Sequence, residues 1–174
     1  TRAKLWWKCA KGHEWQAAIV TRTKGGGCPY CSGKKVSNDN NLAIQFPNLM
    51  NEWDFEKNSP LTPNDVYCGS TKKFWWKCAK GHEWQARVYN RTRNQSGCLY
   101  CAGKLVNDDN CLQTLYPDLS NEWHPSKNGT LTPKDVIPGS YKKAWWICNR
   151  GHEWQAMIDN RSRHNSGCPY CAGL

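Results

Sequence analysis

The sequence lacks any apolar run long enough to form a signal peptide or a membrane-spanning helix. It also lacks a glycine-rich phosphate loop and a recognisable pairing of a nucleophile with a base. Acidic residues are few, with 14 Asp and Glu against 24 Lys and Arg, so the formal net charge is +10. These absences argue against a membrane protein and against an enzyme. The excess of positive charge favours a polyanionic partner.

Cysteine, by contrast, is abundant: nine of the 11 cysteines belong to one pattern that occurs three times in 174 residues. Each copy reads Cys-x3-His, a spacer of 14 or 15 residues, and Cys-x2-Cys. Two short ligand pairs across a hairpin-sized spacer can hold one zinc ion tetrahedrally, whereas disulfides leave the in-register histidine without a role. The sequence therefore predicts three structural zinc ions, with the ligands Cys9, His13, Cys28, Cys31, Cys78, His82, Cys98, Cys101, Cys148, His152, Cys168 and Cys171.

The pattern recurs every 69 or 70 residues, which indicates an array of modules rather than one large domain. A module of this size is marginal with an apolar core alone, so a zinc staple makes physical sense. We place the modules at residues 1–66, 67–136 and 137–174, and both ends cut a repeat, as expected of a fragment. Because zinc-binding cysteines must stay reduced, we expect an intracellular location such as the cytoplasm, nucleoid or nucleus.

Each module is predicted to contain a β-hairpin and short helices. The segments on either side of the Cys-x3-His pair alternate as strands do, and Gly12, Gly81 and Gly151 stand where a knuckle needs a positive φ. Short helices are expected at 41–46 and 111–116, after the prolines at 47 and 117, and after the Thr caps at 62 and 132. The fold class is small α+β: three tandem zinc-ribbon or treble-clef-like hairpin modules, linked by short helices.

Two cysteines lie outside the pattern. Cys68 aligns with Pro138, and Cys111 aligns with Asn41. A ligand needed in every module would not be replaced in this way, so we interpret both as free packing thiols.

Two further histidines also do not recur at equivalent positions of the other modules. His124 and His164 have no histidine counterparts and are not expected to bind metal. A glutamate follows each ligand histidine, but a strand points neighbouring side chains to opposite faces. We therefore expect contacts near the site or on the surface, rather than catalysis, from Glu14, Glu83 and Glu153.

Eleven tryptophans occupy equivalent module positions. Most are interpreted as core, because a small module fills its interior with a few large side chains. One member of each Trp-Trp pair must face away from the other on a strand, so one tryptophan per module is expected to be partly exposed. Base stacking or a methyl-lysine cage is the functional alternative.

The strand after each ligand histidine has one face that barely varies, predicted to be core, and one that varies. On the variable face of the second module, Gln85 and Arg91 are constant between modules, whereas Arg87 and Tyr89 are not. Constant residues are predicted to hold phosphates and variable ones to read base edges, with drift of surface residues as the alternative. The predicted contacts are Gln16, Arg22, Lys72, Lys73, Gln85, Arg87, Tyr89, Arg91, Arg93, Lys142, Lys143, Gln155, Met157, Asp159, Arg161 and Arg163.

Three motifs, W-W-x-C-x-x-G-H-E-W-Q-A, C-P-Y-C-x-G and P-x-L-x-x-E-W, resemble the probable zinc-ribbon repeat domains of unknown function. Those domains occur in tandem in bacterial, phage and some eukaryotic proteins, sometimes beside nuclease domains. The resemblance covers essentially the whole chain and implies the same twelve ligands and a role in nucleic-acid transactions, with DNA favoured. The chain departs from the pattern at Leu99, which replaces proline and should not affect ligation.

We therefore predict a tandem zinc-ribbon array that binds double-stranded DNA; a monomer is favoured, but the sequence does not determine the oligomeric state. An RNA or single-strand binder that uses exposed Trp and Tyr is one alternative, and a protein-interaction or spacer array is another. Four protein ligands close each zinc to water, so no catalysis is expected from this stretch of chain. A catalytic domain elsewhere in a full-length protein stays open.

Overall fold

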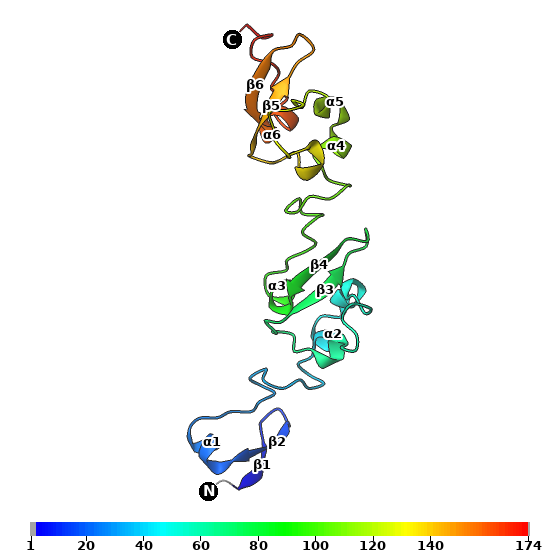
Figure 1. Ribbon diagram of the computed structural model, residues 1–174. Helices are drawn as coiled ribbons and strands as arrows, with labels where there is room; N and C mark the ends of the chain where they lie inside the picture. Colours follow the sequence, from blue (N-terminus) through cyan, green and yellow to red (C-terminus); the bar gives the residue numbers. More distant parts are fainter. Residues whose placement is uncertain (1–2, 174) are drawn as a thin grey trace. The chain divides into compact units, whose positions relative to one another are not determined.

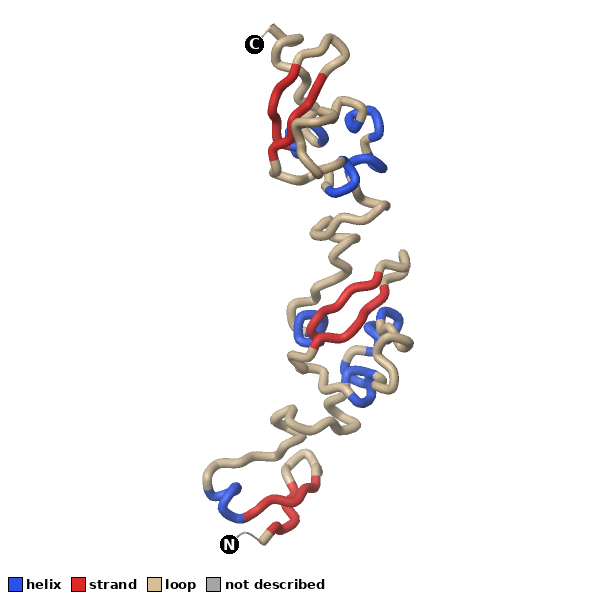
Figure 2. Tube along the Cα trace, viewed as in Figure 1, coloured by secondary structure: helices blue, strands red, loops and turns tan. Residues whose placement is uncertain are grey.

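The repeated element of the fold is a two-stranded antiparallel hairpin followed by one turn of helix (Figures 1 and 2). The computed structural model describes residues 3–173, and the chain forms two compact units, Thr1–Cys98 and Leu99–Leu174. The hairpins pair β1 (Lys4–Lys8) with β2 (Glu14–Ala18), β3 (Lys73–Lys77) with β4 (Glu83–Arg87), and β5 (Lys143–Ile147) with β6 (Glu153–Met157). The helical turns after them are α1 (Ile19–Thr23), α3 (Val88–Thr92) and α6 (Ile158–Ser162). None of the helices within residues 3–173 is long and apolar enough to cross a membrane.

Short helices precede the second and third hairpins. Asn41 caps the first of them, because its side chain accepts the Ile44 N–H at 2.9 Å. Thr62 precedes a helix with proline at its first position, as the sequence predicts, and it also forms a capping box with Asp65. The elements are α2 (Leu42–Gln45), η1 (Pro47–Glu52) and η2 (Pro63–Asp65) in one unit, and α4 (Leu112–Leu115), α5 (Pro117–Ser120) and η3 (Pro133–Asp135) in the other.

These short helices pack on the hairpin that follows them in the chain. In the first unit, Trp53 forms an isolated β-bridge with Trp76, and the two rings meet edge to face with centroids 5.4 Å apart. In the second unit, Trp123 and Trp146 form the same bridge, with centroids 5.2 Å apart. The core of the second unit contains Leu112, Val136, Ala144, Trp146, Trp154, Ile158 and Cys168.

The packing unit therefore differs from the sequence-based grouping. The repeat pattern assigns residues 41–66 to the first hairpin, whereas in the structure Trp53 bridges Trp76 of the second hairpin and the Asp54 N–H donates to the Trp75 carbonyl at 3.3 Å. The reason is that the apolar face of β3–β4 needs a cover, and Trp53 supplies it. The module boundaries at 66/67 and 136/137 describe the period of the sequence repeat, and they remain predictions.

The interpretation of the tryptophans is confirmed for the face that is predicted to be core. Trp15, Trp84 and Trp154 are buried on the second strand of each hairpin, and Trp76 and Trp146 are fully buried on the first strand. Their partners on the other face of the hairpin are more exposed, and Trp6 is 70% exposed. The half-buried members are Trp75 and Trp145.

One element was not predicted. The strand after each ligand histidine ends sooner than expected, and the chain turns into a helix at Ile19, Val88 and Ile158. In α3 the buried residues are Val88, Arg91 and Thr92, which is the i, i+3, i+4 spacing of a helix rather than the alternation of a strand. The two-residue period therefore fails after Arg87, and the side chains beyond it do not share a face with Gln85.

Candidate metal centres and basic surface

Three sets of four side chains converge, each made of three cysteines and one histidine. Within each set the potential ligand atoms all lie within 4.8 Å of one another. These are the twelve residues that the sequence predicts, grouped as Cys9, His13, Cys28 and Cys31; Cys78, His82, Cys98 and Cys101; and Cys148, His152, Cys168 and Cys171.

The hairpin brings its own ligand pairs together. Cys9 follows β1, and a tight turn returns the chain to β2 through hydrogen bonds from Cys9 N–H to the His13 carbonyl (3.1 Å) and from Gly12 N–H to the Cys9 carbonyl (2.9 Å). Gly12 has a φ of 85°, which a side chain would disfavour. The second pair forms a similar knuckle, in which the Cys31 N–H lies 3.5 Å from the Cys28 Sγ.

The distances between ligand atoms fit a tetrahedral zinc ion. Bond lengths of about 2.3 Å to sulfur and about 2.0 Å to nitrogen predict separations of about 3.5 Å between S and N and about 3.8 Å between two S atoms. In the first set, His13 Nδ1 lies 3.4, 3.6 and 3.4 Å from the Sγ atoms of Cys9, Cys28 and Cys31. The Cys9 and Cys31 sulfurs are 3.8 Å apart. A bound zinc ion would act as a structural cross-link between the two knuckles.

The other sets repeat this geometry. His152 Nδ1 lies 3.5, 3.6 and 3.3 Å from the Sγ atoms of Cys148, Cys168 and Cys171. His82 Nδ1 lies 3.5 Å from Cys78 Sγ and 3.6 Å from Cys98 Sγ. Nδ1 is thus the ligand atom in all three sets, and the chain holds three structural zinc sites.

The first thiol has a lowered pKa in the first and third sets. Burial alone would raise the pKa of Cys9, but the backbone N–H groups of Lys11 and His13 and the neighbouring thiols outweigh burial and lower this pKa to about 6. The pKa of Cys148 falls to about 7 for the same reasons. In contrast, burial and the neighbouring cysteines raise the pKa of Cys31 to about 11. Cys9 and Cys148 therefore ionise more readily than Cys31, and zinc binding must displace the remaining protons.

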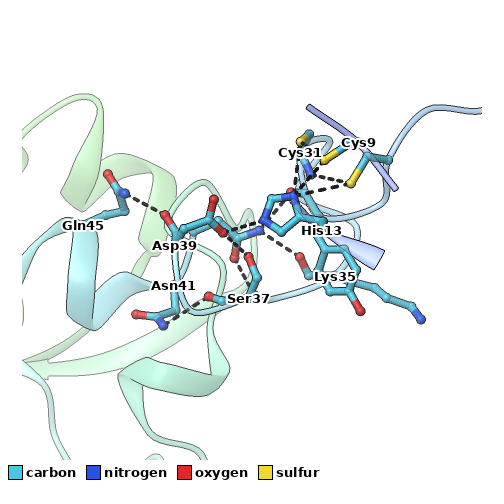
Figure 3. Close-up of polar contacts among 11 residues, drawn as sticks. Cys9, His13, Cys31, Lys35, Ser37, Asp39, Asn41 and Gln45 are labelled. Atoms are coloured by element: carbon cyan, nitrogen blue, oxygen red, sulfur yellow. Dashed lines mark hydrogen bonds and ion pairs between the residues drawn. The ribbon is translucent and has the colours of Figure 1, made fainter. Parts of the chain in front are cut away.

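The second ring nitrogen of His13, Nε2, also forms a hydrogen bond, which we did not predict from the sequence. His13 Nε2 lies 2.8 Å from Asp39 Oδ1 (Figure 3). This carboxylate raises the pKa of His13 to about 9. The Ser37 hydroxyl donates to the same oxygen at 2.5 Å. An acidic residue eight positions after the last cysteine, present at 39 and 109, was the signal in the sequence.

The residues excluded as ligands lie outside the three sets. Cys68 is half-buried and Cys111 is buried, and neither belongs to a metal-binding group. His124 is buried, where its Nδ1 accepts the N–H groups of Ser126 and Lys127 and its Nε2 lies 2.9 Å from Glu153. It occupies the position of Asp54, whose carboxylate accepts the Lys57 N–H.

The predicted phosphate ligands Arg91 and Arg161 are in the wrong place to bind a phosphate. Both are buried, and each guanidinium forms an ion pair with the glutamate that directly precedes Trp53 or Trp123 and a hydrogen bond to a backbone carbonyl. Arg22 is half-buried against Trp7 and Trp15. The prediction failed because it extended the strand beyond its end. The glutamates, Glu52 and Glu122, stand 39 residues ahead of their arginines and could have been recognised by this constant interval.

Asp159 is a second correction. It is buried, and its carboxylate lies 3.6 Å from Arg163 and 3.4 Å from His164, so it is not available to read a base. Met157 is half-buried. The remaining predicted contacts are exposed, namely Gln16, Lys72, Lys73, Gln85, Arg87, Tyr89, Arg93, Lys142, Lys143, Gln155 and Arg163.

Comparison with known proteins bears directly on these sites. The family described as probable treble clef zinc finger domain matches residues 1–34, 49–104 and 119–174, and each match contains one complete set of four ligands. The second and third matches begin ahead of Trp53 and Trp123, so they include the segment that packs on the hairpin. No curated protein matches the chain.

Proposed function

Because the chain belongs to the family of probable treble clef zinc finger domains, we propose that its zinc-stapled modules form a binding array for nucleic acid, with double-stranded DNA as the partner. Zinc fingers of this kind serve in nucleic-acid or protein binding, and a formal net charge of +10 favours the polyanion. The proposed role is binding, with no catalytic step.

One observation carries the proposal: Lys73 on β3 lies directly opposite Arg87 on β4, and both are exposed. Like charges that face each other across a hairpin destabilise it. Neither side chain forms an ion pair with another residue in the described part of the chain. This pair of like charges destabilises the hairpin, and no acidic side chain within residues 3–173 neutralises it. Such a pair is suited to binding phosphate groups.

A groove in the same unit supplies two further cations. Lys34 and Lys72 both line a cavity of about 240 Å³, together with Ser70. The Ser70 hydroxyl oxygen accepts the Lys72 N–H at 3.2 Å, which leaves the hydroxyl hydrogen free to donate to a phosphate oxygen. Asp65 also lines this cavity, but its carboxylate is bound to Thr62. The same residue types recur 70 residues later as Lys104, Ser140 and Lys142.

The exposed face of the second hairpin offers a surface for bases. Trp75 pairs with Gln85 beside the Lys73–Arg87 pair, and Gln85 is exposed. The position of Arg87 is Ala18 in the first hairpin and Met157 in the third. We propose that the constant lysines position the array on the DNA backbone and that the variable position contributes to base preference.

The alternative of single-stranded DNA or RNA has one specific observation in its favour. Trp6 is 70% exposed, and a free indole face can stack on an unpaired base. In the second and third hairpins, by contrast, Lys57 and Lys127 lie over the equivalent rings at 4.6 and 4.7 Å. Two of the three equivalent rings are therefore partly covered, which favours the duplex.

Competition binding tests the proposal. The zinc-loaded chain is bound to a labelled duplex and challenged with unlabelled duplex DNA, single-stranded DNA and RNA of one sequence, at about 50 and about 200 mM salt. Duplex DNA should compete best, and all affinities should fall with salt. Better competition by single-stranded DNA or RNA would contradict the proposal and indicate that the chain binds that nucleic acid instead. Salt-independent or undetectable binding would leave a protein-interaction or spacer array.

A further inference from the structure

We propose that Asp39 is a positioning residue that fixes the zinc-binding form of His13 and ties the first zinc site to helix α2. A carboxylate can only accept hydrogen bonds, so the 2.8 Å contact between Asp39 Oδ1 and His13 Nε2 requires the ring proton to lie on Nε2. In a neutral ring, the lone pair then lies on Nδ1, the atom that faces the three sulfurs.

Asp39 is itself held in place by a folded loop. The Ser37 hydroxyl donates to Oδ1 at 2.5 Å, and the Ser37 N–H donates to the Asn40 side chain at 2.8 Å. The Asn40 amide in turn donates to the Tyr30 carbonyl at 2.9 Å, and Tyr30 lies between Cys28 and Cys31. The loop is therefore fastened to the second knuckle, and this holds the carboxylate against His13.

The same residue reaches the next helix through its backbone. Gln45, the last residue of α2, donates from its side chain to the Asp39 carbonyl at 2.7 Å (Figure 3). Asn41, which caps α2, donates from its side chain to the Ser37 carbonyl at 3.2 Å. A continuous path thus runs from the zinc ligand His13 through Asp39 to α2. Zinc at the first site should therefore also order the linker at residues 37–41.

The third site offers an internal reference. His152 Nδ1 has the same sulfur neighbours, but Nε2 has no carboxylate partner among residues 3–173. A substitution at Asp39 should leave this site unchanged, whereas general damage to the protein would affect both.

Zinc release read site by site by NMR tests the proposal in the full chain. A chelator is titrated while the amide signals near His13 and His152 are followed, and a long-range 1H–15N spectrum reports the protonated ring nitrogen. In Asp39→Ala, the first site should release zinc at a chelator concentration about 10- to 100-fold lower than in wild type. Removing the residue that hydrogen-bonds a metal-binding histidine usually weakens metal binding by this factor. In Asp39→Asn the effect should be smaller, since the amide oxygen still accepts. Asn38→Ala, an exposed neighbour, is the matched control.

Backbone relaxation tests the link to α2. Cys9→Ser, which removes a ligand of the first site, should lower the order parameters of residues 37–41, whereas Cys148→Ser should not. The proposal is overturned if Asp39→Ala leaves zinc release at the first site unchanged or changes both sites equally. It is also overturned if the linker stays equally ordered in Cys9→Ser.

Discussion

The guanidinium carbon of Arg91 lies 4.9 Å from the centre of the Trp76 ring and 5.3 Å from that of Trp84. Its nitrogens also bind Glu52 and the Ser96 carbonyl. Burial lowers the pKa of Arg91, and Glu52 opposes this effect. A residue whose recurrence in every module suggested phosphate binding is therefore part of the core, and it joins the helix before the hairpin to the loop after it.

Arg91→Ala should destabilise the first unit without acting directly on nucleic acid. It removes an ion pair and the packing against two indole rings. We expect the free energy of unfolding to fall by about 2–3 kcal/mol, below the usual cost of breaking a fully buried pair because Glu52 keeps some contact with water. Urea denaturation at saturating zinc measures the change. Lys72→Ala, an exposed control, should stay within about 0.5 kcal/mol of wild type, and an equal effect of the two substitutions would contradict the assignment.

Metal content should be three zinc ions per folded chain. Cys78→Ser should reduce this number to two and unfold the second hairpin, because zinc supplies much of the folding free energy of such a small module. Elemental analysis gives the count, and NMR shows which hairpin loses its signals. A folded wild-type chain with clearly fewer than three zinc ions would refute the site assignment.

The two cysteines outside the sets should be dispensable for metal binding. Cys68→Ser and Cys111→Ser are expected to retain all three zinc ions. Cys111 is the more buried, so its replacement should cost more, about 1 kcal/mol, although Thr114 and the Asp108 carbonyl can bond the new hydroxyl. Zinc content and denaturation midpoints of the two variants check this, and release of a metal ion from either would show a misassigned ligand.

Arg87→Met, which installs the residue of the third hairpin, should change the preferred DNA sequence. Removing an arginine that binds a base edge alters discrimination at that base pair by about 1–3 kcal/mol. Lys73→Ala should instead weaken binding to all sequences equally, because a phosphate contact carries no sequence information. Selection from a random duplex library distinguishes the two. If Arg87→Met lowers affinity but recovers the same sequences, Arg87 contacts only the backbone.

The metal centres could be predicted from the sequence because short spacings fix them: a knuckle forces Cys9 and His13 together whatever the rest of the chain does. The capping box of Thr62 and Asp65 was predictable for the same local reason. The role of Arg91 needed more than local spacing: the constant interval to Glu52 is a signal in the sequence, but the contact depends on where a five-residue strand ends and on tertiary packing. The contact of Asp39 with His13 is likewise a matter of tertiary structure.

The most direct test of the proposed function is the salt dependence of duplex binding by wild type and by the variant in which Lys72, Lys73, Arg87 and Arg93 are all alanine. Each side chain that neutralises a phosphate should contribute about −0.9 to the slope of log K against log salt. The variant should therefore show a slope smaller in magnitude by about 0.9 for each of the four that binds a phosphate in wild type. It should also stay folded with three zinc ions, because all four side chains are exposed. An unchanged slope and affinity would contradict the assignment of this surface to DNA.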